Sequence, residues 1–296
     1  MQAKLNIIVT GSTSGIGLAT VKNRAKRNDR AYHIFVTSRK LANAKATIEE
    51  LSQELPNTTS IFTALELDLG NRWKVDAFVE GLETSGTKID VLVNNAGINL
   101  FERPNESKEK FLLQWNVNYA HTRYLTEQVL EKDLITNSGK IINVSSEIGN
   151  FSQFEDINPD LYAQLKKFET FDMETVAEIE NLFLSDFETI EGQAQWPQWV
   201  SGTTKFFLNL FTIILSKDPR VVERDIQVYS MCPGFCKTNL TMGLPFTVTR
   251  TSDQGCQTIL YLIHHTRSIG TSRAAFSQGR RRALTFPLSL ITTSKS

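Results

Sequence analysis

The chain has 296 residues, of which 41% are hydrophobic and 22% are charged, so it is long and apolar enough to bury the core of one large globular domain. Its 32 basic and 32 acidic residues balance, which argues against a protein whose overall charge attracts it to nucleic acid or to an anionic membrane. No apolar run reaches the roughly 18 residues of a membrane span, and the first residues read as a core strand, so we expect neither a span nor a signal peptide.

Short apolar runs alternate with amphipathic segments along the first half of the chain. A run rich in β-branched residues that ends in a turn is typical of a buried parallel strand, and apolar residues three and four apart are typical of a helix. Their alternation predicts an α/β fold, a Rossmann-type doubly wound parallel sheet with helices on both faces. The predicted strands are 5–10, 33–38, 61–67, 89–94 and 140–145, and the predicted helices are 15–27, 41–55, 72–83 and a long stretch that ends near 135.

The segment after the fifth strand has a different composition. Residues 151–192 contain eleven acidic residues but only two lysines, with few Gly, Ser or Pro. This predicts a pair of acidic amphipathic helices, inserted at 147–197. The apolar positions that carry the helical spacing are Leu161, Leu165 and Phe168, followed by Val176, Ile179, Leu182 and Phe183.

Helix and strand then resume at 201–217, 225–231 and 252–265. We therefore expect a single nucleotide-binding domain over residues 1–270, followed by a basic, Ser/Thr-rich tail over 271–296. That tail is either an unattached terminus or a docking peptide. The three cysteines lack the further soft ligands of a zinc site, so we expect reduced thiols, no metal and a cytoplasmic, reducing compartment; they are Cys232, Cys236 and Cys256.

A glycine-rich turn, TGSTSGIG at 10–17, joins the first strand to the first helix. Such a turn lets backbone N–H groups approach a pyrophosphate, which the following helix N-terminus stabilises. By itself the pattern also fits an ordinary tight turn, but its position between strand and helix favours a nucleotide site.

The glycine spacing, with the NNAG stretch after the fourth strand, resembles the short-chain dehydrogenase/reductase family. Other stretches match that family in order over about residues 5–265. The resemblance assigns orientation of substrate and water to Asn118 and Ser146, and contact with the cofactor ribose to Lys205. It implies that the cofactor is NADP(H) or NAD(H), bound by Gly11, Ser14, Gly15, Ile16, Gly17, Asn95, Ala96, Gly97, Lys205, Pro233, Gly234 and Thr238. The long insertion is similar to that of the monomeric carbonyl reductases of the family, in which it blocks the helix face used by other members for association.

Charge at the end of the second strand bears on the cofactor. An acid there favours the ribose hydroxyl of NAD, whereas an arginine favours the phosphate of NADP. Arg39 and Lys40 stand at this place without an acid, which favours NADP(H), although two cations also suit the start of a surface helix. Asp68 either binds the adenine amino group, as the resemblance implies, or caps a turn.

The proton donor of the family is missing. A tyrosine is expected four residues before Lys205, and Ser201 stands there instead. A second Tyr-x3-Lys pattern, Tyr162 to Lys166, follows Ser146 at a suitable distance. It leads into the acidic segment, however, whereas Lys205 begins the helix before the sixth strand and its Pro-Gly turn. We therefore place the catalytic position at Ser201.

These residues predict an NADP(H)-binding protein that resembles carbonyl reductases but is weakly active or non-catalytic, as a sensor or an assembly subunit. The alternative is an active NADPH-dependent reductase of quinones, aldehydes or ketones that uses Tyr162 or water as proton donor. A carbonyl compound is the expected substrate if the protein is active. Protein partners would bind at the acidic insertion or the tail, and we expect no nucleic acid.

Overall fold

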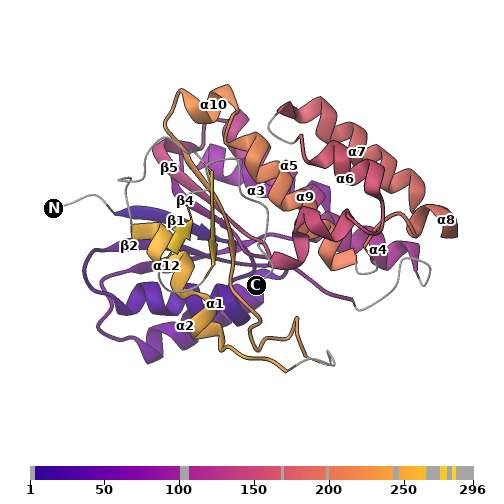
Figure 1. Cartoon of the computed structure of the whole chain (residues 1–296). Helices are drawn as coiled ribbons and strands as arrows, with labels where there is room; N and C mark the ends of the chain where they lie inside the picture. The colour runs from indigo at the N-terminus through magenta and orange to yellow at the C-terminus, as the bar shows by residue number, and fades with distance from the viewer. Residues whose placement is uncertain are drawn as a thin grey trace.

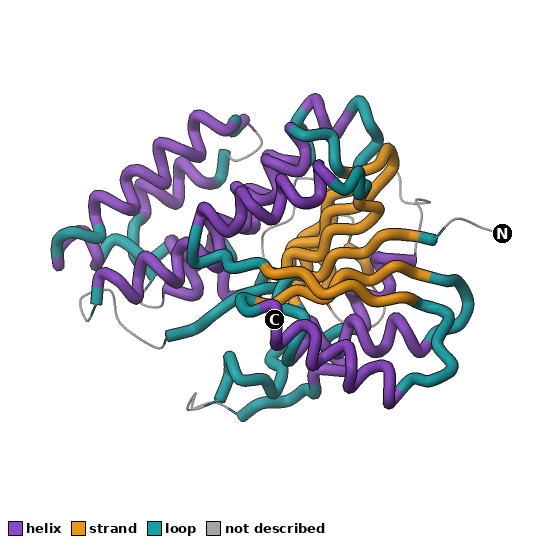
Figure 2. The backbone as a smooth tube through the Cα atoms, turned by 180° about the vertical axis from the view of Figure 1, so that it is seen from behind, coloured by secondary structure: helices purple, strands orange, loops and turns teal. Residues whose placement is uncertain are grey.

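The computed structural model describes residues 4–100, 107–167, 170–197, 200–242, 247–264, 274–278 and 282–284. Its centre is an eight-stranded sheet in the order β3-β2-β1-β4-β5-β6-β7-β8, with helices on both faces (Figures 1 and 2). Neighbouring strands pair in parallel, apart from the antiparallel pair β7 and β8. The strands are β1 (Leu5–Val9), β2 (Tyr32–Ser38), β3 (Ile61–Glu66), β4 (Ile89–Asn94), β5 (Ile135–Val144), β6 (Gln227–Cys232), β7 (Ala274–Gln278) and β8 (Arg282–Leu284). This architecture confirms the predicted Rossmann-type fold.

The two faces of the sheet are covered by different helices, as β1 illustrates. Ile7 and Val9 pack in one buried cluster, while Ile8 between them belongs to the other. Side chains alternate between faces along a strand, so a strand buried on both faces must be apolar throughout. The first cluster includes α1 (Gly15–Lys26), α2 (Leu41–Glu54) and α12 (Gln257–His264), and the second includes α3 (Arg72–Thr84), α5 (His121–Glu131) and α9 (Val200–Leu215).

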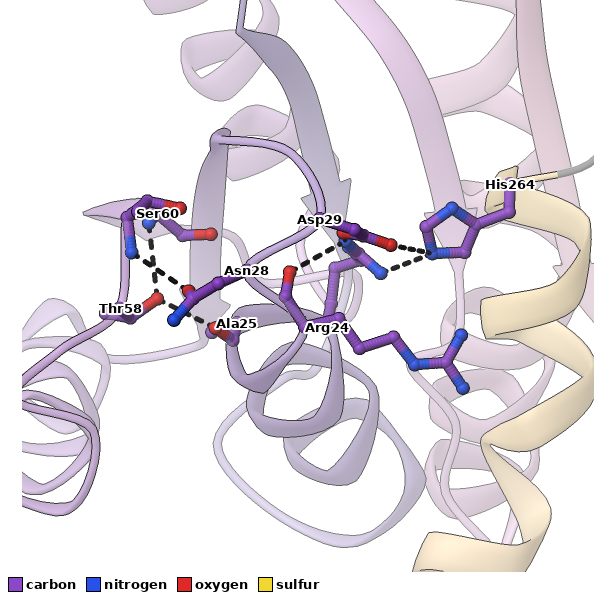
Figure 3. Close-up of polar contacts among 9 residues, drawn as sticks. Arg24, Ala25, Asn28, Asp29, Thr58, Ser60 and His264 are labelled. Atoms are coloured by element: carbon purple, nitrogen blue, oxygen red, sulfur yellow. Dashed lines mark hydrogen bonds and ion pairs between the residues drawn. The ribbon is translucent and has the colours of Figure 1, made fainter.

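A buried arginine ties α1 to α12. Arg24 is 1% exposed, and its guanidinium makes polar contacts with His264 and Asp29 (Figure 3). It also lies over the ring of Tyr32, 4.0 Å from the ring centroid. The guanidinium also donates to the backbone oxygen of Arg27 at 3.1 Å. The acid, the aromatic ring and this carbonyl together compensate for the hydration that the buried charge has lost. These contacts hold α12 against α1, the helix that follows the glycine-rich turn.

The long helix predicted before the fifth strand is interrupted. It consists of α4 (Lys108–Trp115), a π-helical turn η1 (Asn116–Ala120) and α5, and Ile135 already belongs to β5. The strand extends back through Thr-Asn-Ser-Gly, residues that suggest a loop in the sequence. A register shift opposite Ile89 and a positive φ of 58° at Ser138 accommodate this irregular start.

The insertion is helical, as predicted, and packs into the same buried cluster as α9. Its apolar residues Leu161, Val176 and Phe183 are buried, whereas Leu182 is 45% exposed, and Phe168 lies outside the described residues. Figure 1 shows α6 and α7 beside each other on the α9 side of the sheet. The elements of the insertion are η2 (Glu147–Gly149), η3 (Phe151–Phe154), α6 (Pro159–Leu165), α7 (Met173–Asp186) and α8 (Ile190–Gln193).

The end of the chain differs from the prediction. The predicted helix 252–265 is divided into α11 (Ser252–Gly255) and α12, after a short α10 (Pro219–Val222) that precedes β6. Part of the predicted tail joins the sheet, because β7 pairs with β6 from Val228↔Ala274 onward. Without β7 the backbone of β6 would be an unpaired edge, so this pairing has a physical reason that the tail's composition hides. No helix among the described residues has the length and apolarity to cross a membrane.

Candidate functional site

The glycine-rich turn after β1 has the backbone shape that only glycine adopts easily. Gly11 and Gly15 have φ values of +62° and +55°. A side chain at Gly17 would place its Cβ 2.5 Å from the Gly11 oxygen and 2.6 Å from the Asn95 amide nitrogen. All three glycines are thus required by the turn itself, and the turn leads directly into the N-terminus of α1. Ser14 is the N-cap residue of that helix, and its side chain makes no capping hydrogen bond.

Hydrogen bonds join this turn to the end of β4. The Thr10 hydroxyl accepts from the backbone N–H groups of Asn95 and Ala96, both at 2.9 Å. The Asn95 amide donates to the Thr10 oxygen at 2.8 Å. A Cβ at Gly11 would lie 3.0 Å from the Ala96 Cα, so the two segments are in direct contact. The predicted residues Gly11, Asn95 and Ala96 therefore belong to one hydrogen-bonded unit.

The end of β2 and the turn after β6 border the same glycines. Thr37 accepts the N–H of Gly11 at 3.0 Å with its hydroxyl, so Arg39, two residues on, lies close to the turn. On the other side, Thr238 lies 3.3 Å from the position of a Cβ at Gly15. A Cβ added at Gly255 would lie 3.4 Å from Ile16 and 3.5 Å from Pro233. The turn after β6 therefore lies beside the start of α1. Gly234 has a φ of +76° in that turn.

Asp68 follows β3 and is partly buried. Its carboxylate accepts the N–H of Gly70 at 2.8 Å, which is the geometry of a capped turn. The contact occupies one oxygen atom, and adenine recognition by this residue stays a prediction.

Lys205 lies on α9 and reaches the end of β5. Its ammonium donates to the Val144 oxygen at 2.7 Å, and the Ser145 hydroxyl donates to the Lys205 oxygen at 3.2 Å. Burial lowers the pKa of Lys205 to about 8. A Cβ at Gly149 would lie 2.5 Å from the Lys205 backbone, so the loop that carries Ser146 packs directly on this turn of α9. Lys205 and Ser146 thus share one corner of the sheet.

Ser201 lies one helical turn before Lys205 in α9, and residues four apart share a helix face. It is partly buried, and its carbonyl accepts the Thr204 hydroxyl at 3.0 Å. Ser146 is also partly buried and accepts the Ile148 N–H at 3.3 Å. The structure therefore places the two serines on adjacent segments, because η2 and α9 pack backbone to backbone.

Asn118 lies in the π-helical turn, is 2% exposed and joins three segments. Its amide oxygen accepts the Ile98 N–H and its amide nitrogen donates to the Ile98 oxygen, both at 2.8 Å. The same nitrogen lies 3.4 Å from the Thr204 hydroxyl. The Asn118 side chain also lies close to Gly97, since a Cβ added at Gly97 would be 3.4 Å from the Asn118 amide oxygen. This side chain therefore connects α9 to the loop after β4, and orientation of substrate and water by Asn118 stays a prediction. Thr204 is the partner of Asn118 on α9, and no pattern in the sequence indicates this role.

Three tyrosines of the chain, Tyr119, Tyr162 and Tyr229, contact residues other than Ser146 and Lys205. Lys166 lies over the ring of Tyr162, 4.9 Å from its centroid, within and just after α6. The Tyr119 hydroxyl donates to Glu180 of the insertion, and burial raises the pKa of Tyr119 well above 10. The Tyr229 hydroxyl donates to Gln227 at 2.6 Å. None of these three contacts involves Ser146 or Lys205. No group of metal-ligating side chains occurs in the described part of the chain.

Together, a sheet of the Rossmann type and a glycine turn that touches the ends of β2, β4 and β6 define a nucleotide-binding class of α/β protein. The family profile of the short chain dehydrogenases matches residues 5–158, and the chain belongs to this family.

The relatives agree with this assignment. The chain is 26% identical to (+)-neomenthol dehydrogenase of Arabidopsis thaliana over 257 residues, which cover 79% of this chain and 83% of the relative. It is 27% identical to carbonyl reductase [NADPH] 1 of Sus scrofa over 259 residues, which cover 86% and 85%. Among solved structures, salutaridine reductase of Papaver somniferum has the same fold, with a TM-score of 0.70 at 21% identity over 92% of this chain and 99% of that one.

Proposed function

We propose that this chain binds NADP(H) at the glycine-rich turn and that it is weakly active or non-catalytic, because Ser201 stands at the position of the proton donor. In this form it acts as a cofactor-dependent sensor or as a subunit of an assembly. The name of its relative carbonyl reductase [NADPH] 1 supports the cofactor, as do the exposed cations Arg39 and Lys40 at the start of α2.

One observation carries the loss of catalysis: the lysine of the site is in place while the residue one turn before it is a serine. The Lys205 ammonium reaches the end of β5, 2.7 Å from the Val144 oxygen, beside the loop of Ser146. A tyrosine at 201 would present a phenol with an ordinary pKa near 10, which a neighbouring cation lowers. A serine hydroxyl is far less acidic and its side chain is several ångströms shorter. Loss of a positioned general acid costs about 10²–10⁴ in rate.

The alternative is an active NADPH-dependent carbonyl reductase in which Tyr162 or a water molecule donates the proton. The names of the relatives support a carbonyl substrate in either case. One contact argues against Tyr162: the ammonium of Lys166 lies over the Tyr162 ring. Lys205, by contrast, donates a hydrogen bond to the end of the strand that precedes Ser146.

The experiment measures NADPH binding by fluorescence titration, and NADPH oxidation with quinones, aldehydes and ketones. We expect the natural chain to bind NADPH with little turnover, and Ser201→Tyr to raise the rate about 100-fold or more. Ser201→Phe is the matched control, since it fills the same space without a hydroxyl and should stay inactive. Turnover by the natural chain that equals that of Ser201→Tyr would contradict the proposal.

A further inference from the structure

An acidic residue from β3 lies at the start of α2, where the sequence shows only cations. The register of the parallel pair places Glu66 opposite Ser38, the last residue of β2. Because parallel strands end at the same edge, Glu66 becomes a neighbour of the segment that begins α2. The backbone N–H of the next residue, Leu67, donates to the Ser38 oxygen at 2.8 Å, which holds the end of β3 against the segment that begins α2.

The charges around this carboxylate are unevenly paired. The Lys74 ammonium donates to the Glu66 carboxylate at 2.7 Å. This contact lowers the pKa of Glu66, so the group is anionic at neutral pH. By contrast, Arg39 and Lys40 are exposed, and their side chains make no hydrogen bond or ion pair with the part of the chain that the structure describes. The start of α2 therefore has one carboxylate that is paired with a lysine and two cations that are unpaired among the described residues.

The end of β2 is where the adenosine ribose of a dinucleotide lies in a fold of this type. The two cofactors differ there in one group, a hydroxyl in NAD(H) and a phosphate in NADP(H). A carboxylate accepts a hydrogen bond from the hydroxyl but repels the phosphate, and it competes with the phosphate for the N-terminus of α2. Arg39 and Lys40 have the opposite preference, since they attract the phosphate.

We infer that Glu66 is a specificity-determining residue that reduces the preference of the chain for NADP(H) over NAD(H), by accepting the ribose 2′-hydroxyl and repelling the 2′-phosphate. This inference rests on the proposed cofactor site. Lys74 moderates the effect, because its ammonium offsets the charge of Glu66 when the phosphate binds. The consequence is that the chain binds both dinucleotides, with a smaller difference in affinity than Arg39 and Lys40 alone would produce.

An exposed ion pair by itself contributes little to stability, typically about 0–1 kcal/mol. Glu66 differs from such a pair in its position opposite Ser38, beside the two unpaired cations at the start of α2. This position concerns an anion bound at this corner, so the effect of Glu66 should appear in the ratio of cofactor affinities and not in the stability of the fold.

The test measures the Kd of the full chain for NADPH and for NADH by isothermal titration. Glu66→Gln should tighten NADPH binding and weaken NADH binding, so that the ratio of the two Kd values changes about tenfold, which corresponds to about 1.4 kcal/mol. Lys74→Met should move the ratio in the opposite direction, because the charge of Glu66 is then no longer offset. Both positions are solvent-accessible, and circular dichroism checks that the variants fold.

Glu54→Gln is the matched control. Glu54 lies at the other end of α2 and also pairs with a lysine, Lys22. Its replacement should leave the ratio unchanged. A ratio that Glu66→Gln does not change, while NADPH still binds, would overturn this inference alone. If the natural chain binds neither dinucleotide, the inference fails together with the proposed cofactor site.

Discussion

The ammonium of Lys205 donates a hydrogen bond to the carbonyl oxygen of Val144, at 2.7 Å. This bond connects the second turn of α9 with the last residue of β5, directly before Ser145 and Ser146. It holds a partly buried cation at the carboxyl edge of the sheet, where ligands of open α/β sheets bind. The lysine therefore lies at the edge of the sheet where a cofactor is proposed to bind, and the residue one helical turn before it is Ser201.

The lowered pKa of Lys205 predicts a pH dependence of cofactor binding. Its value is about 8 in the folded protein, and an anionic cofactor should raise it by favouring the ammonium. Binding then takes up a proton above pH 8 but not below. We expect the Kd for NADPH to be constant below about pH 8 and to rise above it, by up to about tenfold per pH unit.

Fluorescence titrations between about pH 6.5 and 9.5 would show this dependence. Lys205→Met should bind NADPH more weakly at pH 7 and lose the rise above pH 8. A natural chain whose Kd does not change over this range would show that Lys205 does not contact the cofactor.

Gly17→Ala should disrupt the glycine turn. The added methyl group would lie 2.5 Å from the Gly11 oxygen and 2.6 Å from the Asn95 amide nitrogen, and both partners belong to the hydrogen-bonded unit that follows β1 and β4. The backbone must move, which should lower the free energy of unfolding by about 1–3 kcal/mol and weaken NADPH binding. Urea denaturation and the NADPH titration measure the two effects. Gly81→Ala is the control, since nothing lies within 4 Å of its Cβ position in α3, and alanine there should stabilise the helix by about 0.5–1 kcal/mol.

Much of the fold could be predicted because its signals are local. The apolar runs of β1, β2 and β4, the glycine turn and the acidic amphipathic segment each determine their own conformation. The failures lie where pairing overrides local composition. The polar start of β5 is a strand because Ile135 pairs with Ile89, and Ala274–Gln278 is a strand because β6 offers an unpaired edge.

The candidate site divides in the same way. Gly11, Gly15 and Gly17 could be found from their spacing, since the turn requires glycine at each of them. Glu66 could not be found as a neighbour of α2, because it is distant from Leu41 in sequence and only the register of β2 and β3 brings it there. Thr204 was missed for a similar reason, as its contact with Asn118 depends on the packing of η1 against α9.

Tyr162→Phe tests where the catalytic position lies. If Ser201 occupies that position, removal of the Tyr162 hydroxyl should change neither NADPH binding nor any residual rate, and Ser201→Tyr should remain active in the double variant. NADPH oxidation by the four proteins, with one substrate accepted by Ser201→Tyr, gives the comparison. A loss of about 100-fold or more in the natural background would instead identify Tyr162 as the proton donor.

Lys140 allows a test of stability against pH. It is buried in β5 and caps α12, because its ammonium donates to the Leu262 and Ile263 oxygens at 2.8 and 2.9 Å. Burial lowers its pKa to about 8, whereas an unfolded lysine titrates near 10.4.

Between about pH 8 and 10.4 the unfolded chain therefore binds a proton that the folded chain has lost, so stability should increase with pH in this window and the cost of the buried charge should be constant below it. The free energy of unfolding in urea, measured at several pH values for the natural chain and for Lys140→Met, isolates this effect from the similar titration of Lys205. Above pH 8 the free energy of unfolding of the natural chain should increase relative to that of Lys140→Met, by at most about 1.4 kcal/mol per pH unit. Lys45→Met, which removes an exposed lysine of α2, should show no such trend. If the difference between the natural chain and Lys140→Met is the same at pH 7 and pH 10, Lys140 keeps its proton throughout, and the carbonyl groups of α12 compensate fully for its burial.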